Sequence, residues 1–143
     1  MKFRFLTDEF FKVYSNCPEM ERKNNRPYAH LCIVEMDNLK FAIPIRHHIT
    51  HNYAIFTDKE KTKGLDLSKT VIIVDDKYID YSKIAYISAE EYNLLVNKKY
   101  YIKEKLKSYI KTYKKALKHK DIPRNKSLCE KSTLQYFHKE LGI

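Results

Sequence analysis

Two strand-like runs joined by a turn dipeptide constrain this chain more than any other feature. Residues 29–36 (AHLCIVEM) and 39–45 (LKFAIPI) are rich in aliphatic and aromatic residues, and Asp37-Asn38 lies between them. A two-residue connection of this kind is typical of a tight β-hairpin. Pro44 has no N–H to give to a sheet, so it indicates a strand end or an edge. The sequence therefore predicts a hairpin whose second strand exits into the segment RHHITH.

The rest of the chain indicates an α+β fold in one domain, residues 1–143, because no internal repeat or linker interrupts it. The further strands are predicted in residues 2–6, 53–56, 70–74 and part of 78–87, with a charged connection around Gly64. A short helix is predicted after Thr7, and a long helix from the capping box Ser88-Ala89-Glu90-Glu91 to about Lys120, before Pro123. A last helix is predicted at 128–141, after Ser127 as a cap and before Gly142.

The charge of the chain favours an anionic partner. In 143 residues the formal net charge is +10 and the pI is about 9.4. A field of that sign attracts nucleic acid first and an anionic membrane second. The charge alone does not choose between them.

The cysteines and the hydropathy pattern indicate a cytoplasmic protein. Cys17, Cys32 and Cys129 are an odd number at wide spacing without a C-x-x-C motif, and the segment MKFRFLTDEF lacks the long apolar run of a signal peptide. No window approaches about 18 consecutive apolar residues. We expect a reduced protein that does not span a membrane.

The predicted long helix carries most of the positive charge. Between Lys98 and Lys120 there are ten lysines and one acid, Glu104. A solvated helix face usually mixes both signs, so this one-sidedness favours phosphate binding. The lysines expected to contact RNA are Lys103, Lys107, Lys111, Lys114 and Lys118. A membrane-surface role is the weaker interpretation, because the apolar stripe is rich in tyrosine and indicates core packing.

Three of the six histidines lie in the segment RHHITH, and three interpretations are open for them. His47 and His51 have the i, i+4 spacing of a helical metal site, but no Asp, Glu or Cys lies between Lys40 and Phe56 and the segment follows a strand. The second interpretation is acid/base chemistry. The third is that these histidines are solvated or packed without a chemical role. We expect neither a metal nor a cofactor.

Acid/base chemistry would suit RNA cleavage without a metal. Free imidazole titrates at about pH 6.5, so His47 and His48 can serve as base and acid at neutral pH. The neighbouring Arg46 can neutralise charge that develops on phosphate oxygens. RNA supplies its own nucleophile, the 2′-OH, and the products would be a 2′,3′-cyclic phosphate and a 5′-OH end.

A polar segment between the first helix and the hairpin adds further candidates. Tyr28 follows the basic run ERKNNRP and can stack on a base or orient the substrate. Arg22, Lys23, Arg26, Tyr14 and His51 are candidates for RNA binding. Most of the twelve tyrosines need no functional explanation.

Three segments together resemble a known family. These are the start KFRFL, the run HLCIVEMDNLKFAIPIRHHI and the tail CEKSTLQYF. They are similar to the toxins of type III toxin–antitoxin systems, the ToxN/AbiQ superfamily, and the RHHI form looks most like the TenpN/CptN branch. The resemblance covers most of the chain and is carried mainly by residues 1–56.

The resemblance implies a compact, strongly twisted antiparallel sheet, partly barrel-like and flanked by helices, similar to ToxN and the MazF/Kid toxins. It implies a metal-independent, sequence-specific endoribonuclease of bacterial phage defence. It also implies inhibition by a small repeat RNA antitoxin folded as pseudoknots. Such toxins cut this RNA from a precursor and bind it in closed protein–RNA assemblies.

The chain departs from the family at the position expected for catalysis. Where ToxN-like proteins place a Thr-Ser pair after the proline strand, this sequence has Arg46 and His47. The family lysine before the second strand corresponds to Tyr28, and an aromatic of the first helix corresponds to Phe10 or Tyr14. Because of these changes, we expect a histidine rather than a serine to take part in catalysis. The alternative from another class is a non-catalytic basic module that binds RNA or DNA through the same residues.

Overall fold

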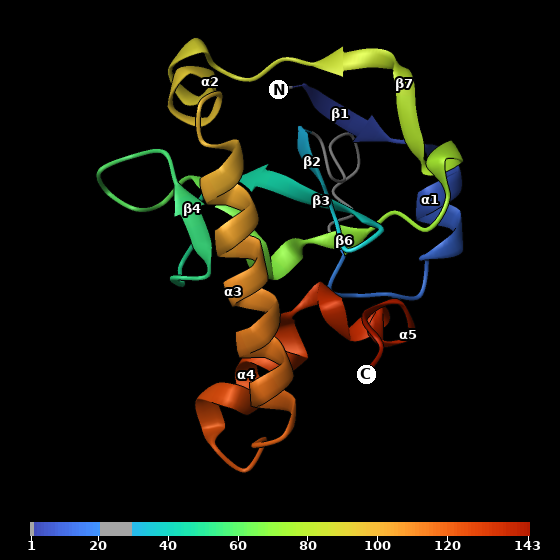
Figure 1. Ribbon diagram of the computed structural model, residues 1–143, viewed down its shortest axis with the longest axis vertical. Coiled ribbons are helices and arrows are strands. Elements are labelled where there is room, and N and C mark those ends of the chain that lie inside the picture. The colour runs from blue at the N-terminus through green and yellow to red at the C-terminus, as the bar shows by residue number, and fades with distance from the viewer. Residues whose placement is uncertain (1, 21–29) are drawn as a thin grey trace.

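The computed structural model describes residues 2–20 and 30–143 and has an α+β fold, as predicted. Among these residues an antiparallel sheet of seven strands is accompanied by five α-helices (Figure 1). The strands are β1 (Phe3–Leu6), β2 (Leu31–Met36), β3 (Leu39–Arg46), β4 (Ala54–Phe56), β5 (Gly64–Asp66), β6 (Val71–Ile72) and β7 (Ile79–Ala85). The helices are α1 (Asp8–Val13), α2 (Ala89–Leu95), α3 (Lys99–Leu117), α4 (Pro123–Lys131) and α5 (His138–Leu141).

The described sheet is open. Its strand order is β4-β5-β3-β2-β1-β7, with β6 also paired to β3, so β4 and β7 lie at the two ends. The antiparallel sheet and the flanking helices are as expected. The partly barrel-like closure that the family resemblance implies is not seen in the part of the chain that the structure describes.

The predicted hairpin is confirmed. β2 and β3 pair in register from Leu31 opposite Pro44 to Met36 opposite Leu39. Asp37 and Asn38 form the turn with φ of 54° and 62°. Two positive φ angles in a two-residue connection match the right-handed twist of the flanking strands, which explains the Asp-Asn sequence.

Pro44 lies inside a central strand rather than at an edge, and the change of partner along β3 explains how. On the edge opposite β2, β3 pairs with β6 through Phe41 and Ala42, and with β5 through Ile45 and Arg46. Pro44 falls between these two stretches. Because the N–H of Ile45 points to the β2 side, where it meets the carbonyl of His30 at 3.2 Å, an N–H at position 44 would face this gap.

The charged connection around Gly64 contains a strand that was not predicted. Gly64–Asp66 forms β5 and pairs with both β3 and β4. Gly64 has φ of +152°, and a Cβ placed there would overlap the carbonyl oxygen of Ile55. The backbones of β4 and β5 therefore approach so closely that only glycine fits at this crossing.

The predicted long helix is interrupted, so the expectation of one helix from Ser88 to about Lys120 is wrong. α2 ends at Leu95, and α3 begins at Lys99 after a short turn in which the N–H of Lys98 binds the carbonyl of Leu95 at 2.9 Å. Leu95 is buried. The break lets α2 and α3 run in different directions while both contribute to the core (Figure 1). The predicted capping box is confirmed, since the Ser88 hydroxyl accepts from the N–H of Glu91 at 3.1 Å.

The C-terminal segment also differs from the prediction of one helix at 128–141. Pro123 starts α4 rather than only ending α3, because proline suits the first helical position, where no N–H is needed. α4 ends at Lys131, and Ser132 caps a 3₁₀ turn, η3 (Thr133–Tyr136), through the N–H of Leu134. Gly142 ends α5 in the left-handed conformation, as predicted.

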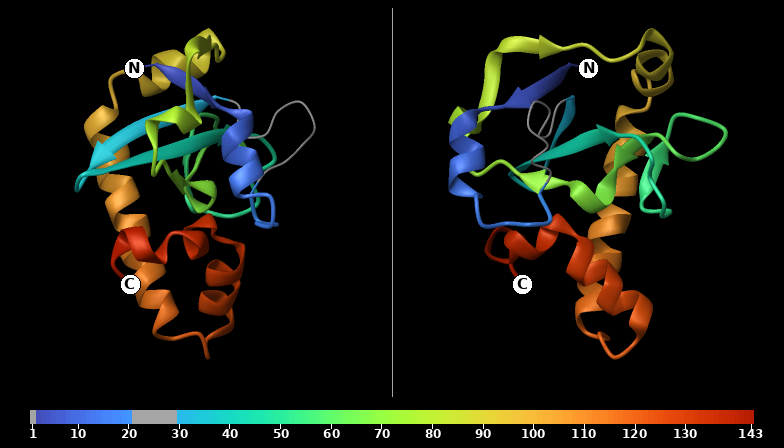
Figure 2. Two further views of the ribbon diagram at one scale, coloured as in Figure 1. Left: turned by 90° about the vertical axis from the view of Figure 1, so that its right-hand side faces the viewer. Right: turned by 180° about the vertical axis from the view of Figure 1, so that it is seen from behind.

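α3 lies across one face of the sheet (Figures 1 and 2). Its apolar stripe joins the sheet residues in one core, in which the largest fully buried side chains include Tyr113, Phe3, Phe10 and Phe41. The buried residues of the helix are Ile102, Leu106, Tyr109, Ile110, Tyr113 and Ala116. This packing leaves the lysine-bearing faces of α3 outside and places the end of β3 beside β5.

Candidate functional site

Arg46, the last residue of β3, is held by a carboxylate of β5. Its Nη1 lies 2.7 Å from Oδ2 of Asp66. The Asp66 side chain is 0% exposed, whereas that of Arg46 is 27% exposed. A charge-assisted bond to a buried group restricts the guanidinium and still leaves part of it at the surface. The strand end therefore presents an oriented cation to solvent.

The same carboxylate collects donors from two other residues. Oδ1 of Asp66 accepts from the N–H and the hydroxyl of Ser68 at 3.0 and 2.6 Å, and Nε2 of His51 lies 3.3 Å from it. Burial on its own would raise the pKa of Asp66. The hydrogen bonds from His51, Ser68 and Arg46 outweigh it and hold this pKa below the ordinary 3.8. Asp66 is therefore ionised at neutral pH and is in contact with Arg46, Ser68 and His51.

His51 is oriented by contacts on both ring nitrogens. Nδ1 accepts the N–H of Tyr53 at 3.0 Å, so in the neutral ring the proton lies on Nε2. Nε2 faces Asp66 and the Ser68 hydroxyl, the latter at 3.2 Å. This geometry gives His51 a positioning role inside the protein. RNA binding by His51 stays a prediction, and its polar atoms are already engaged in this structure.

His47 and His48 form a two-residue tip between fixed neighbours. On one side is Arg46, and on the other Ile49 is buried and donates its N–H to the carbonyl of Thr62 at 2.9 Å. Both histidines are exposed, and neither ring has a hydrogen-bond partner among residues 2–20 and 30–143. The tip therefore exposes two imidazoles to solvent in the two residues that follow the oriented Arg46.

The backbone of the tip is unusual at one residue. His48 has φ of 59°, a left-handed conformation that few residues other than glycine adopt. Such a conformation costs about 1–2 kcal/mol in a non-glycine residue. Strained residues of this kind concentrate at functional loops, which makes His48 a candidate on backbone geometry as well as chemistry.

The metal-site interpretation loses its geometric basis. The segment that carries His47 and His51 is made of bends and extended backbone, so i, i+4 spacing does not bring the two rings to one helical face. In the described part of the chain, no group of three or more His, Cys, Asp or Glu side chains is arranged to hold a metal ion. Acid/base chemistry and solvated histidines without a chemical role are the two interpretations that stay open.

A second loop runs beside the histidine tip and adds positive charge. The Asp58 carboxylate closes this loop by accepting from the N–H and hydroxyl of Thr62 at 3.0 and 2.6 Å and from the N–H of Lys63 at 3.0 Å. Thr62 also accepts the bond from Ile49 that anchors the tip. The loop exposes Lys59, Lys61 and Lys63, together with one acid, Glu60. The sequence predicts only a charged connection around Gly64, and the structure places these lysines in the loop that adjoins the histidine tip.

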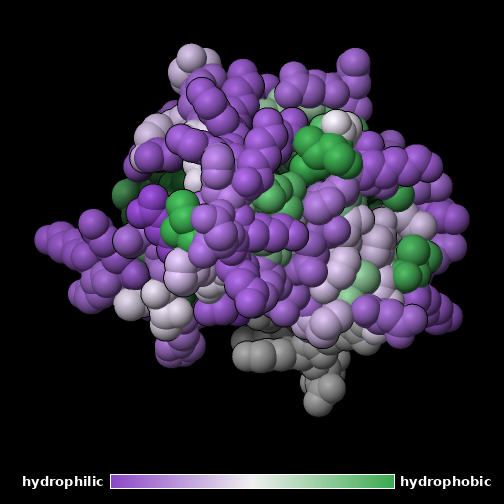
Figure 3. All heavy atoms as spheres, turned by 90° about the horizontal axis from the view of Figure 1, so that it is seen from below, coloured by the Kyte–Doolittle hydropathy of each residue, from purple (hydrophilic) through white to green (hydrophobic). Residues whose placement is uncertain are grey.

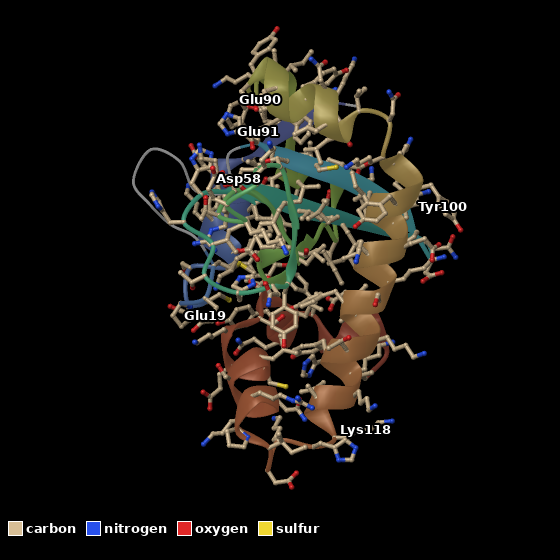
Figure 4. The ribbon with its side chains drawn as sticks, turned by 90° about the vertical axis from the view of Figure 1, so that its left-hand side faces the viewer. Glu19, Asp58, Glu90, Glu91, Tyr100 and Lys118 are labelled. Carbon is tan, nitrogen blue, oxygen red and sulfur yellow. The ribbon has the colours of Figure 1, made fainter. Side chains whose placement is uncertain are left out.

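The N-terminal end of α2 holds the other side of that loop. The Thr57 hydroxyl donates to Oε2 of Glu91 at 3.1 Å, while Oε1 of the same carboxylate accepts from the Ser88 hydroxyl at 3.2 Å. Figure 4 shows Asp58 below Glu90 and Glu91, on the side away from Tyr100. Glu91 of the capping box therefore also binds the loop that carries Lys59, Lys61 and Lys63.

The lysines predicted to bind RNA form one stripe along α3. Lys103, Lys107, Lys111, Lys114 and Lys118 recur at intervals of three or four residues, next to the buried stripe. Within the described residues only Lys107 of this stripe has an ion-pair partner, Glu104 at 3.6 Å. The end of the molecule where α3 finishes is predominantly hydrophilic, with small separate apolar patches (Figure 3). The stripe is free to meet an anionic surface.

The remaining predicted residues are divided between the core edge and the undescribed segment. Tyr14 packs against Phe10, Tyr78 and Phe137 with ring centroids 4.5–6.5 Å apart, and burial raises the pKa of its hydroxyl to about 12. Tyr14 is thus half-buried in an aromatic cluster. The predicted residues Tyr28, Arg22, Lys23 and Arg26 lie outside the described residues.

Asp66 and Ser68 are the site residues that the sequence analysis missed. They stand in the run GLDLSK, where an aspartate two residues before a serine is a signal for a side-chain-capped turn. Asp66 does cap the 3₁₀ turn η1 (Leu67–Lys69). The local signal predicts the turn but not that the same carboxylate reaches Arg46 and His51, which come from other strands and loops.

Comparison with known proteins gives no match, since no family model, no curated protein and no solved structure is significantly similar to this chain. No helix among the described residues has the length and apolar content needed to cross a bilayer.

Proposed function

We propose that this chain is the toxin of a type III toxin–antitoxin system, a metal-independent endoribonuclease that cleaves RNA through attack by the 2′-OH. One observation carries the proposal. The exposed pair His47-His48 lies directly beside Arg46, and the orientation of Arg46 is set by the buried Asp66 at 2.7 Å. Two groups able to move protons and one fixed cation are what this reaction needs from a protein.

In the proposed reaction one histidine of the pair takes the proton from the 2′-OH as the O2′–P bond forms. Arg46 binds a non-bridging oxygen and stabilises the charge of the phosphorane. The other histidine gives a proton to O5′ as the P–O5′ bond breaks. The products are a 2′,3′-cyclic phosphate and a 5′-OH end, and the histidine protonation states are exchanged until water restores them. Tyr28, from the undescribed segment, is proposed to orient the substrate.

The test is incubation of the purified protein with single-stranded RNA in the presence of EDTA. We expect fragments with 2′,3′-cyclic phosphate ends, identified by mass spectrometry, and no cleavage of a substrate with 2′-deoxy at the cut nucleotide. His47→Ala and His48→Asn should each lower the rate by about 10²–10⁴-fold. Asparagine is chosen at position 48 because it tolerates the left-handed backbone.

His119→Ala is the matched control, since His119 is also exposed but lies at the far end of α3. Cleavage at the wild-type rate by His47→Ala and His48→Asn would contradict the catalytic assignment. RNA binding without any cleavage by the wild type would favour the non-catalytic binding module instead.

The proposed partner is a repeat RNA antitoxin that the protein cuts from its precursor and then binds. The α3 stripe, with five lysines at helical spacing, supports binding of a folded RNA. If the proposal is correct, the DNA upstream of the gene holds a tandem array of short repeats. Co-expression with that array should relieve growth arrest caused by the protein.

A further inference from the structure

A basic cavity lies at the opposite end of β3 from the histidine tip. It has a volume of about 260 Å³ and is lined by residues of β1, β2, β3, β7 and the first turn of α3. Lys40 lines it and stands six residues before Arg46 on the same strand. At about 3.4 Å per strand residue this separates the two sites by roughly 20 Å. The cavity is therefore distinct from the candidate catalytic site.

The open edge of β2 forms one wall of the cavity. β1 pairs with β2 only at Leu31 and Cys32, whereas β2 continues to Met36. Among the described residues no strand covers this side of β2 beyond Cys32. Ile33, Val34 and Glu35 thus line the cavity with an unpaired strand edge, which presents backbone donors and acceptors.

Of the four described cations that line the cavity, two have hydrogen-bond or ion-pair partners among the described residues and two do not. Arg4 donates to the carbonyls of Tyr81 and Lys83 at 3.3 and 3.0 Å, and Lys40 pairs with Asp76 at 2.7 Å. Lys2 and Lys99 are exposed and have no ion-pair partner in the described part of the chain. Two ammonium groups at one cavity favour a phosphate.

The negative charge at the cavity is small by comparison. Among the described residues, Glu35 is the one carboxylate of the lining, and it lies 3.6 Å from Lys40. Burial raises the pKa of the Cys32 thiol to about 12, so this lining residue is uncharged at neutral pH. The cavity thus keeps a positive potential.

Tyr81 gives the cavity an aromatic wall of fixed orientation. Tyr81 is 54% exposed, and the centroid of its ring lies 5.3 Å from the guanidinium carbon of Arg4. Its hydroxyl accepts from the Lys40 ammonium at 3.4 Å. An aromatic ring held in place stacks on a base with little loss of conformational freedom.

We infer that this cavity binds one nucleotide unit, with the base stacked on Tyr81 and the phosphate between Lys2 and Lys99. The aromatic wall distinguishes this ligand from a simple inorganic anion, and the open β2 edge offers hydrogen bonds to the base. The unit has two possible sources, a nucleotide of a single-stranded RNA or a free mononucleotide. Only the first source rests on the proposed function, because one strand could then occupy both this cavity and the histidine tip.

The first experiment titrates the ¹⁵N-labelled chain with adenosine 5′-monophosphate, adenosine and inorganic phosphate, monitored by amide chemical shifts. We expect saturable shifts with the monophosphate at Ile33, Glu35 and Tyr81, and much weaker binding of adenosine or phosphate alone. Lys2→Gln/Lys99→Gln should weaken monophosphate binding roughly tenfold or more. Tyr81→Leu should remove the advantage of the monophosphate over inorganic phosphate.

Lys12→Gln/Lys139→Gln is the matched control, because it removes the same charge from two exposed lysines outside the cavity. If this control weakened monophosphate binding as much as Lys2→Gln/Lys99→Gln does, overall charge would explain the effect and the inference would be overturned. Shifts that do not saturate at millimolar monophosphate, or that map away from β2 and Tyr81, would also overturn it.

The second experiment separates the two sources with a short 2′-O-methyl RNA, which cannot be cleaved by 2′-OH attack. Tighter binding of this RNA than of the monophosphate, lost in Lys2→Gln/Lys99→Gln, identifies a nucleotide of an RNA strand. Binding of the monophosphate alone identifies a free nucleotide. His47→Ala should leave monophosphate binding at the cavity unchanged. Nucleotide binding by a wild-type chain that cleaves no RNA would refute the proposed function and would still support the cavity.

Discussion

The Nη1 atom of Arg46 and the Oδ2 atom of Asp66 lie 2.7 Å apart, and they join the end of β3 to the end of β5. The Asp66 carboxylate is fully buried and also accepts hydrogen bonds from Ser68 and His51. Removal of this one carboxylate would therefore take a hydrogen-bond partner away from both Arg46 and His51. The first three predictions test this arrangement.

Asp66→Asn should lower the free energy of unfolding by about 2–3 kcal/mol. This is less than the roughly 3–5 kcal/mol for breaking a fully buried pair, because Arg46 stays partly solvated. Urea denaturation at pH 7 measures the difference. Asp76→Asn is the control, since the Asp76 side chain is 68% exposed and its pair with Lys40 should be worth less than about 1 kcal/mol. Equal losses in the two variants would disprove a special role for Asp66.

The stability that Asp66 provides should disappear in acid. Its pKa in the folded protein is below the ordinary 3.8, so the ionised form is favoured by folding. The contribution is then complete above the unfolded pKa and is lost as the pH falls through the folded pKa. Urea denaturation of the wild type and Asp66→Asn from pH 7 to pH 3 should show a difference that is constant above about pH 5 and shrinks below about pH 4. A difference that grew toward acid would contradict the sign of the shift.

The three histidines of the segment RHHITH should separate into two classes. His47→Ala and His48→Asn remove exposed rings, so we expect unfolding free energies within about 0.5 kcal/mol of the wild type and a large loss of cleavage. His51→Ala removes a hydrogen bond to a buried carboxylate, so we expect its free energy of unfolding to fall by about 1–3 kcal/mol. Thermal unfolding and cleavage rates measured on the same preparations distinguish the classes. A wild-type unfolding free energy for His51→Ala would contradict its positioning role.

Gly64→Ala should destabilise the protein severely, by more than about 4 kcal/mol, because the added Cβ overlaps the backbone of β4. Gly142→Ala is the matched control. It has φ of +73° but no atom within 4 Å of the added Cβ, so only a backbone cost of about 1–2 kcal/mol is expected. Circular dichroism and urea denaturation report both. A folded Gly64→Ala variant with a cost as small as that of Gly142→Ala would show that β4 and β5 can separate.

The lysine stripe of α3 should control the salt dependence of RNA binding. For Lys111→Gln/Lys118→Gln we expect the slope of log K against log salt concentration to fall by about 1.4, at about 0.7 for each phosphate contact to a single strand. The fold should be unaffected, because both side chains are exposed. Binding is measured by fluorescence anisotropy over a salt series. The same loss of slope in Lys12→Gln/Lys139→Gln would show that the stripe has no special part.

Local sequence patterns predicted the elements whose determinants are local. The hairpin follows from Asp37 and Asn38, and the start of α2 from Ser88 and Glu91. The break between α2 and α3 has no such signal, because the apolar stripe continues on both sides of it. Leu95, the last residue of α2, is buried in the core, and such burial is set by the whole fold rather than by local sequence.

The candidate site was also predicted only in part. The exposed His47 and His48 beside Arg46 were expected from the strand exit after Pro44. Asp66 was not, because its partners Arg46 and His51 lie 20 and 15 residues away in the chain and are brought together only by the pairing of β3 with β5. β5 itself has three residues, with glycine at its start, and no strand pattern of that length is recognisable.

The position of β1 in the sheet has a consequence during protein synthesis. Phe3 pairs with Cys32 on one side and with Ala85 on the other. At a translation rate of about 5–20 residues per second, roughly 4 to 16 s separate the synthesis of Phe3 from that of Ala85. The nascent chain can complete β2, β3 and β5, with Arg46 and Asp66, while one edge of β1 is still without its partner. On the ribosome, the strands around the histidine tip are therefore synthesised before β7, which completes the sheet, and before α3.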